Sequence, residues 1–171
     1  MNKSCILGIG LSLIGPTGAT LAQNIVPAAP ATAQMLIRQL QQDAFVRPGL
    51  GFRRVQLGHG FDQVARAWGS PTRRKSTLLS SIWEYRVVND TSVILRGGST
   101  VDSIEVIAGF NSELQSAEGA RFGMATYQVI SIYGNPDKRT SNNLSYLRKG
   151  IEFGFARGGL RSIKVFAPKD K

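Results

Sequence analysis

The side chains that most often carry catalysis are scarce and scattered in this sequence. His59 is the only histidine and Cys5 the only cysteine, so neither a multi-histidine metal site nor a thiolate site can be assembled from the mature chain. The carboxylates show no paired motif; they include Asp62, Glu84, Asp90, Asp102, Glu105, Glu113, Glu118, Asp137 and Glu152. A two-carboxylate hydrolase could still assemble in three dimensions, but nothing in the spacing indicates one. We therefore predict a protein that is not an enzyme, with no catalytic residues, no metal site and no cofactor.

Basic and aromatic residues indicate function more clearly than the catalytic residue types do, and they favour a binding protein. A basic run, RRK at 73–75, precedes a segment in which aromatic and charged residues alternate, WEYR at 83–86. Aromatic anchors surrounded by arginine are typical of protein interfaces. We predict a binding site made of Arg73, Arg74, Trp83, Tyr85 and Arg86. Trp83 and Tyr85 must share one face of a strand, and the sequence leaves open whether that face is core or surface.

The charge of the chain narrows the class of partner. The formal net charge is +10 at pH 7, and it falls by one when Lys3 leaves with the predicted signal peptide described below. Such an excess favours membrane head groups, polyanionic glycans, nucleic acid or an acidic protein. Nucleic acid is the least natural of these for an exported chain. We predict a protein partner of acidic character in the cell envelope and keep an anionic surface as an alternative.

Two short helices and several strands are predicted to position these residues. The segment Phe61–Trp68 carries an apolar stripe at helical spacing, and Thr126–Tyr133 carries a matching one. Gly69 and Gly134 suit the left-handed residue that closes a helix. Strands are expected at 82–88, 101–108 and 160–166, with hairpin turns at 97–98 and 158–159.

The same residue types recur in the two halves of the chain. Gly58, Gln63, Val64, Gly69 and Pro71 return at one constant offset as Gly123, Gln128, Val129, Gly134 and Pro136. Recurrence in register is the signature of a duplicated unit. We therefore predict an α+β fold of two tandem repeats, each a helix plus a three-stranded antiparallel meander, preceded by an N-terminal helix. The first repeat spans 51–110, and the second spans 111–171 and opens with a linker helix near 111–120.

The recurring order of glycine, Gln-Val, aromatic residue, glycine and proline, followed by an aromatic strand and a hairpin ending in Ile-x-Val, resembles the SmpA/OmlA (BamE-like) family of outer-membrane assembly lipoproteins. The two-unit arrangement resembles the β-lactamase inhibitory proteins. The likeness covers about Val55 to Val165. It implies an accessory role in envelope or outer-membrane assembly or, alternatively, a secreted inhibitor of another enzyme. Assembly-type members carry a lipobox cysteine, which this chain lacks.

The N-terminus predicts export. Lys3 precedes an apolar run, Ile6–Ile14, which is followed by a Gly-Pro break and small residues as far as Ala22. This order is typical of a secretory signal. We predict a signal peptide over 1–22, then a leader and N-terminal helix over 23–50, with the helix itself from about Thr32 to Val46. The mature chain, without a transmembrane span, is expected to be a periplasmic or secreted binding module.

Overall fold

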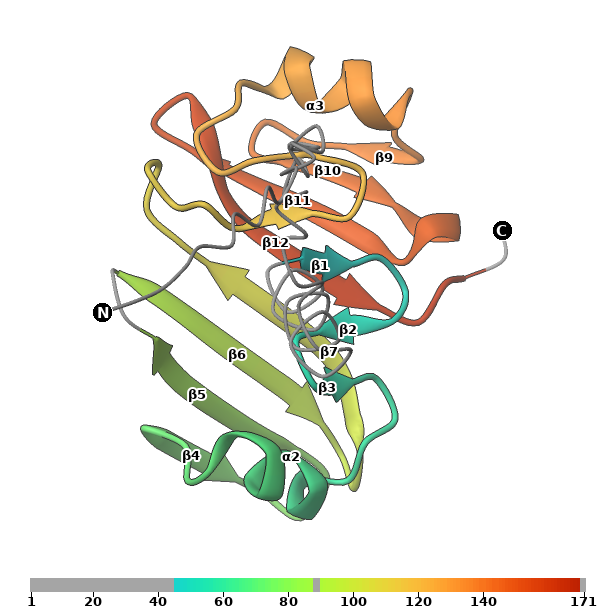
Figure 1. Cartoon of the computed structure of the whole chain (residues 1–171). Coiled ribbons are helices and arrows are strands. Elements are labelled where there is room, and N and C mark those ends of the chain that lie inside the picture. The colour runs from blue at the N-terminus through green and yellow to red at the C-terminus, as the bar shows by residue number, and fades with distance from the viewer. Residues whose placement is uncertain (1–44, 88–89, 170–171) are drawn as a thin grey trace, which may run out of the picture.

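Two β-sheets and two α-helices make up the part of the chain that this computed structural model describes, residues 45–87 and 90–169 (Figure 1). The large sheet has eight strands in the order β4-β5-β6-β7-β12-β11-β10-β9, and the small sheet has four in the order β3-β2-β1-β8. The large sheet contains β4 (Arg73–Ser76), β5 (Ser81–Val87), β6 (Thr91–Gly97), β7 (Val101–Ile107), β9 (Lys138–Arg139), β10 (Asn143–Tyr146), β11 (Ile151–Ala156) and β12 (Gly159–Phe166). The small sheet contains β1 (Phe45–Arg47), β2 (Gly51–Phe52), β3 (Val55–Gln56) and β8 (Gln115–Ser116). The helices are α2 (Phe61–Trp68) and α3 (Thr126–Tyr133), with a short 3-10 turn at Leu147–Lys149.

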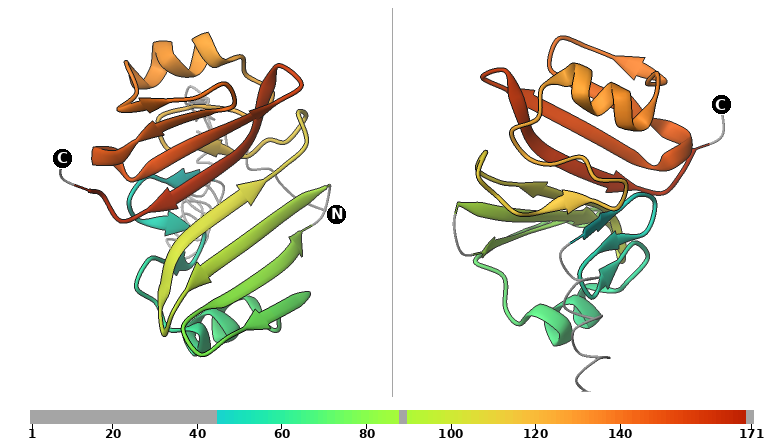
Figure 2. Two further views of the ribbon diagram at one scale, coloured as in Figure 1. Left: turned by 180° about the vertical axis from the view of Figure 1, so that it is seen from behind. Right: turned by 45° about the horizontal axis from the view of Figure 1, so that its top comes forward.

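Both helices and the small sheet pack on the same face of the large sheet. Figure 1 shows α3 at one end, α2 at the other, and β1, β2 and β3 between them. The left view of Figure 2, taken from behind, shows the strands of the large sheet with no other described element in front of them. The fold is therefore two-layered, and the described residues leave one face of the large sheet open.

The predicted α+β fold is wrong. Over residues 45–87 and 90–169 the chain is mainly β, with two sheets and only two α-helices, and not a tandem of helix-plus-meander repeats. Each helix is followed by four strands of the large sheet instead of three, and β7 pairs with β12 so that all eight strands form one sheet. The extra strands are β4 and β9, whose basic residues resemble a solvated loop in sequence. The small sheet was not predicted, because strands of two or three residues leave no periodic pattern.

Two further helix predictions fail where they can be checked. Most of the predicted N-terminal helix, with the predicted signal peptide and leader, lies outside the described residues. Its last residues, Phe45 and Val46, belong to strand β1, where Val46 pairs with Phe52 of β2. The predicted linker helix at 111–120 is also wrong, since this segment forms turns and strand β8, which pairs with β1 in parallel.

The predictions of α2 and α3 are confirmed, and so are those of the strands now seen as β5, β7 and β12. The residue before each helix, Gly60 or Ala125, provides no side-chain cap. Instead the Gln three positions on accepts the free backbone N–H: Gly60 N–H donates to Gln63 Oε1 at 2.9 Å, and Ala125 N–H donates to Gln128 Oε1 at 2.8 Å. The recurring glutamines are thus explained as helix-start residues.

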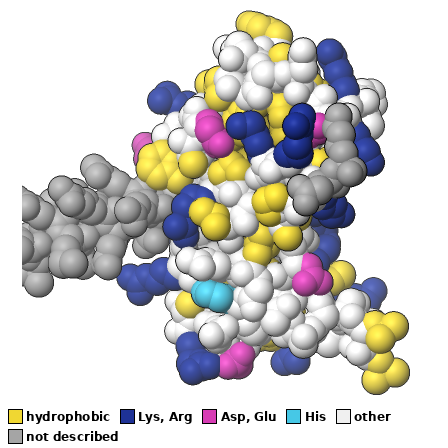
Figure 3. All heavy atoms as spheres, turned by 90° about the vertical axis from the view of Figure 1, so that its right-hand side faces the viewer, with side chains coloured by type: hydrophobic (Ala, Val, Ile, Leu, Met, Phe, Trp, Pro, Cys, Tyr) yellow, Lys and Arg dark blue, Asp and Glu magenta, His cyan; other side chains and the backbone are white. Residues whose placement is uncertain are grey.

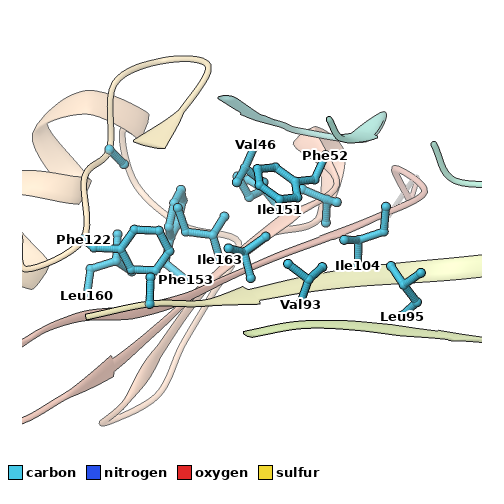
Figure 4. Close-up of a cluster of buried hydrophobic side chains, with 14 of the residues drawn as sticks. Val46, Phe52, Val93, Leu95, Ile104, Phe122, Ile151, Phe153, Leu160 and Ile163 are labelled. Atoms are coloured by element: carbon cyan, nitrogen blue, oxygen red, sulfur yellow. The ribbon is translucent and has the colours of Figure 1, made fainter. Parts of the chain in front are cut away.

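The core lies between the small sheet and the middle of the large one. Figure 4 shows Val46 and Phe52 of the small sheet on the same side of the large sheet as Ile104, Ile151 and Ile163. All five side chains are at most 1% exposed. Full burial of such a side chain stabilises by about 1.5–3 kcal/mol, so this contact joins the two sheets into one hydrophobic core.

A tyrosine fixes the end of each helix to the sheet. The Tyr85 hydroxyl donates to the carbonyl oxygen of Gly69 at 3.1 Å, and the Tyr146 hydroxyl donates to that of Gly134 at 2.9 Å. Both glycines close a helix with a positive φ, 78° and 80°, but their ψ angles of −162° and −165° place them outside the left-handed helical region that the sequence predicted. Burial raises the pKa of both tyrosines, so each hydroxyl keeps its donor proton.

Candidate functional site

The predicted aromatic anchors lie in the core. Trp83 and Tyr85 are only 6% and 7% exposed. The Trp83 ring centroid is 4.9 Å from that of Phe61, and the Tyr85 centroid is 5.2 Å from that of Trp68, so both pack under helix α2. They therefore do not form the exposed aromatic surface that we predicted.

The three predicted arginines are exposed but do not share one face. Arg74 pairs with Trp83 across β4 and β5, and its guanidinium lies 5.1 Å from the Trp83 ring on the helix side. Arg73 pairs with Glu84, and Arg86 pairs with Ser92, so strand alternation places both on the opposite, open side. A binding role for these arginines stays a prediction.

The open face of the large sheet, defined as the side chains that alternate away from the helices, is the broadest candidate surface. One register row crosses all eight strands: Arg73, Glu84, Ile94, Glu105, Lys164, Glu152, Ser145 and Lys138. Neighbouring rows add the apolar side chains of Ile82, Ile107 and Phe166, each partly exposed. The half of this face on β4 to β7 thus carries three partly exposed isoleucines, one in each of three neighbouring rows, with arginines and glutamates beside them.

Most carboxylates on the open face already have partners. Glu105 Oε2 lies 2.8 Å from Arg96 Nη1, and Glu152 Oε2 accepts the Ser145 hydroxyl at 2.6 Å. Glu84 lies 4.0 Å from Arg73, whose side chain is 77% exposed. The surplus on this face is therefore positive.

Arg86 and Lys75 account for part of that surplus. Neither forms an ion pair with a carboxylate within the described parts of the chain. Both belong to the two strands at one edge of the large sheet, β5 and β4. An acidic group from outside could approach them without displacing an internal partner.

The opposite face holds a pocket of about 410 Å³ beside helix α2. Its walls come from Phe52, Arg53, Ala67, Trp68, Tyr85, Arg86 and Val93. The Arg53 guanidinium lies 5.2 Å from the Phe52 ring centroid, and the Arg53 backbone has a φ of 53°, which non-glycine residues seldom adopt. An aromatic wall with two arginines, Arg53 and Arg86, suits a small anionic group.

At the α3 end of the large sheet, a buried tyrosine is hydrogen-bonded to a carboxylate of the same chain, Glu118. The Tyr133 hydroxyl donates to Glu118, and the Lys149 ammonium lies 5.6 Å from the Tyr133 ring centroid. Burial, and secondarily this hydrogen bond, raise the pKa of Tyr133 strongly. Sequence analysis had given Glu118 no role, because it lies in an irregular segment far from Tyr133 in sequence.

No helix among the described residues is both long and apolar enough to cross a membrane. In that same part of the chain, no three histidine, cysteine or carboxylate side chains are grouped closely enough to hold a metal ion.

No family model and no curated protein matches this chain. It is similar to a crystal structure of an extracellular protein containing a SCP domain from Bacillus anthracis, with 14% identity, 65% of this chain and 44% of that chain covered, and a TM-score of 0.47. It is also similar to a cysteine-rich secretory protein from Staphylococcus aureus, with 8% identity, 74% and 48% covered, and a TM-score of 0.48. This chain thus spans less than half of either structure, and likeness at this level assigns neither fold family nor function.

The predicted resemblance to the SmpA/OmlA (BamE-like) family and to the β-lactamase inhibitory proteins is wrong. No family model matches, and the described residues form two sheets with only two α-helices instead of a tandem of helix-plus-meander units. The residues behind the resemblance have structural roles instead: Gln63 and Gln128 complete helix starts, and Gly69 and Gly134 complete helix ends. The assembly role inferred from that family is withdrawn with it.

Proposed function

We propose that this chain is an exported, non-enzymatic binding module that holds an acidic protein partner on the open face of its large sheet. The observation that carries the proposal is the half of this face on β4 to β7, where partly exposed isoleucines lie among arginines. Interfaces concentrate apolar contacts at the centre and arginine among the charged residues. An eight-stranded sheet also offers a broad and rigid platform.

Charge supports the acidic character of the partner. Arg86 and Lys75 lack carboxylate partners within residues 45–87 and 90–169, and the whole chain carries a net charge of +10. Opposite charges at the rim of an interface accelerate encounter and exclude wrong partners. Export is supported by the order of charged, apolar and small residues in the first 22 positions of the sequence.

A photo-crosslinking residue in place of Ile94 tests the proposal in cells that export the chain. Ile94 lies on the open face in β6, and Tyr127 on the exposed side of α3 serves as the control position. We expect a discrete crosslinked product from position 94 and a much weaker one from position 127. Equal products from both positions, or none from position 94, would contradict the proposal.

A charge reversal then tests the electrostatic part. Arg73→Glu with Arg86→Glu should weaken capture about tenfold, and more at low salt, because rim charges act mainly through long-range attraction. The matched control is Arg121→Glu with Arg139→Glu, the same change of charge at exposed positions away from the proposed surface. If both double variants lose capture equally, the net charge and not this surface governs binding.

A further inference from the structure

The turn between β4 and β5 presents two leucines whose side chains are almost fully exposed. Leu78 and Leu79 are 104% and 90% exposed, more than any other large apolar side chain there. Turn positions usually hold glycine, proline, asparagine, aspartate or serine, because these residues fit the backbone or bond to it. Figure 3 shows apolar side chains projecting at the lower right, at the end of the molecule that carries β4 and β5 in Figure 1.

The turn itself is well ordered by hydrogen bonds. Thr77 N–H donates to the Ser80 carbonyl oxygen at 2.7 Å, and Ser80 N–H donates to the Thr77 hydroxyl at 3.1 Å. The Ser76 and Ser81 hydroxyls lie 3.3 Å apart at the base of the turn. The leucines therefore project from a fixed backbone, and their apolar surface adds nothing to folding.

The strand that leads to this tip is basic along its length. Every residue of β4, Arg73–Ser76, is exposed, and three of its four residues are cationic. No carboxylate occurs between Arg73 and Glu84 in the sequence. The apolar tip thus comes almost directly after a positive segment.

We propose that the Leu78–Leu79 tip enters the interface of an anionic lipid bilayer while the cations of β4 contact the lipid phosphates. The spacing fits: a strand advances about 3.3 Å per residue, so Lys75 lies roughly 10 Å behind the leucines. Apolar groups of interfacial proteins are buried about 5–10 Å into the boundary between headgroups and acyl chains. This proposal goes beyond the binding of a protein partner: the cations of β4 are common to both surfaces, whereas the Leu78–Leu79 tip belongs to the lipid contact alone.

Co-sedimentation with lipid vesicles tests the proposal on the processed chain purified after export. The vesicles are phosphatidylcholine alone, or phosphatidylcholine and phosphatidylglycerol in equal parts. We expect binding to the anionic vesicles that Leu78→Ser with Leu79→Ser weakens by about tenfold per leucine. Tyr127→Ser, which removes another exposed apolar side chain, is the matched control and should bind as the native chain does.

The electrostatic part has its own pair of variants at the two edges of the large sheet. Arg73→Glu with Lys75→Glu should weaken binding by at least about fivefold per residue, because each cation near an anionic surface contributes about 1 kcal/mol. Lys138→Glu with Arg139→Glu makes the same change on β9 and should leave binding nearly unchanged. Equal binding to neutral and anionic vesicles would overturn the assignment of β4 to headgroups.

A probe at the tip distinguishes insertion from simple adsorption. Because Cys5 is the only cysteine and lies in the predicted signal peptide, Leu79→Cys introduces a single labelling site into the mature chain. A polarity-sensitive dye there should shift to the blue with anionic vesicles, while the same dye at Tyr127→Cys should not. An unchanged spectrum, or serine variants that bind like the native chain, would overturn the proposal. The proposal would also be overturned if the chain did not bind vesicles and instead needed the two leucines for self-association or for a complex with another protein.

Discussion

Replacing Trp83 by alanine provides the sharpest test of how the large sheet is packed. Trp83 lies between Phe61, whose ring centroid is 4.9 Å away, and Tyr85, at 6.5 Å, and Arg74 covers its ring. Truncation of a buried tryptophan removes its transfer free energy and leaves a cavity, which together cost about 3–5 kcal/mol. With a urea m-value of about 2 kcal/mol/M, the unfolding midpoint should fall by roughly 1.5–2.5 M.

Urea unfolding followed by far-ultraviolet circular dichroism measures this loss without depending on tryptophan fluorescence. Trp83→Phe is the informative control. The Trp83 indole N–H is buried and has no hydrogen-bond partner within the described residues, and an unsatisfied buried donor costs about 1–3 kcal/mol. The phenylalanine variant removes this penalty, so it should lose less than half as much stability as the alanine variant. A loss of stability below about 1 kcal/mol for Trp83→Ala would show that this side chain is not buried but lies at the surface.

Three other predictions follow from contacts at the ends of the sheet. Gln63→Ala and Gln128→Ala should each lower the free energy of unfolding by about 1 kcal/mol, as loss of a helix-start hydrogen bond does, and the two losses should add; thermal unfolding of the single and double variants checks this. Glu118→Gln should cost about 1–2 kcal/mol, because the Tyr133 hydroxyl then donates to a neutral oxygen; a loss no larger than that of the exposed Glu113→Gln would contradict this hydrogen bond. Stability should fall as the pH rises above the ordinary tyrosine value of 10.0, because burial raises the pKa of Tyr133 in the folded chain and the unfolded chain therefore loses its proton first. Tyr133→Phe should make that fall shallower, which urea midpoints at about pH 8 and about pH 11 would show.

The elements with strong periodicity could be predicted from sequence, and those without it could not. Helix α2 has apolar residues at helical spacing and a closing glycine, and β5 alternates over its full length. Strand β4 reads as RRKS and has no apolar residue to bury, so only its pairing with β5 makes it a strand. The small sheet arises from long-range pairing, as between Phe45 and Gln115, for which local sequence carries no signal.

The candidate site, too, could be predicted from the sequence only in part. Alternation correctly placed Trp83 and Tyr85 on one face of β5 and Glu84 and Arg86 on the other. It could not decide which face α2 covers, because aromatic residues are equally typical of cores and of interfaces. The exposed Leu78–Leu79 tip was missed because two leucines in sequence resemble part of a buried strand.

The large sheet ends on both sides in a short strand of lysine and arginine, β4 on one edge and β9 on the other. Open strand edges are templates on which further copies can add, and lysine or arginine on an edge opposes such growth because like charges meet. Exposed charges are screened at high ionic strength, so this protection should weaken with salt. A polyanion bound along the basic edges of two molecules would neutralise their charge and bring their sheets into line. The edge strands that otherwise keep the molecules apart would then be the sites at which fibril growth starts. Light scattering with increasing salt, and with an added sulfated polysaccharide, follows this transition directly.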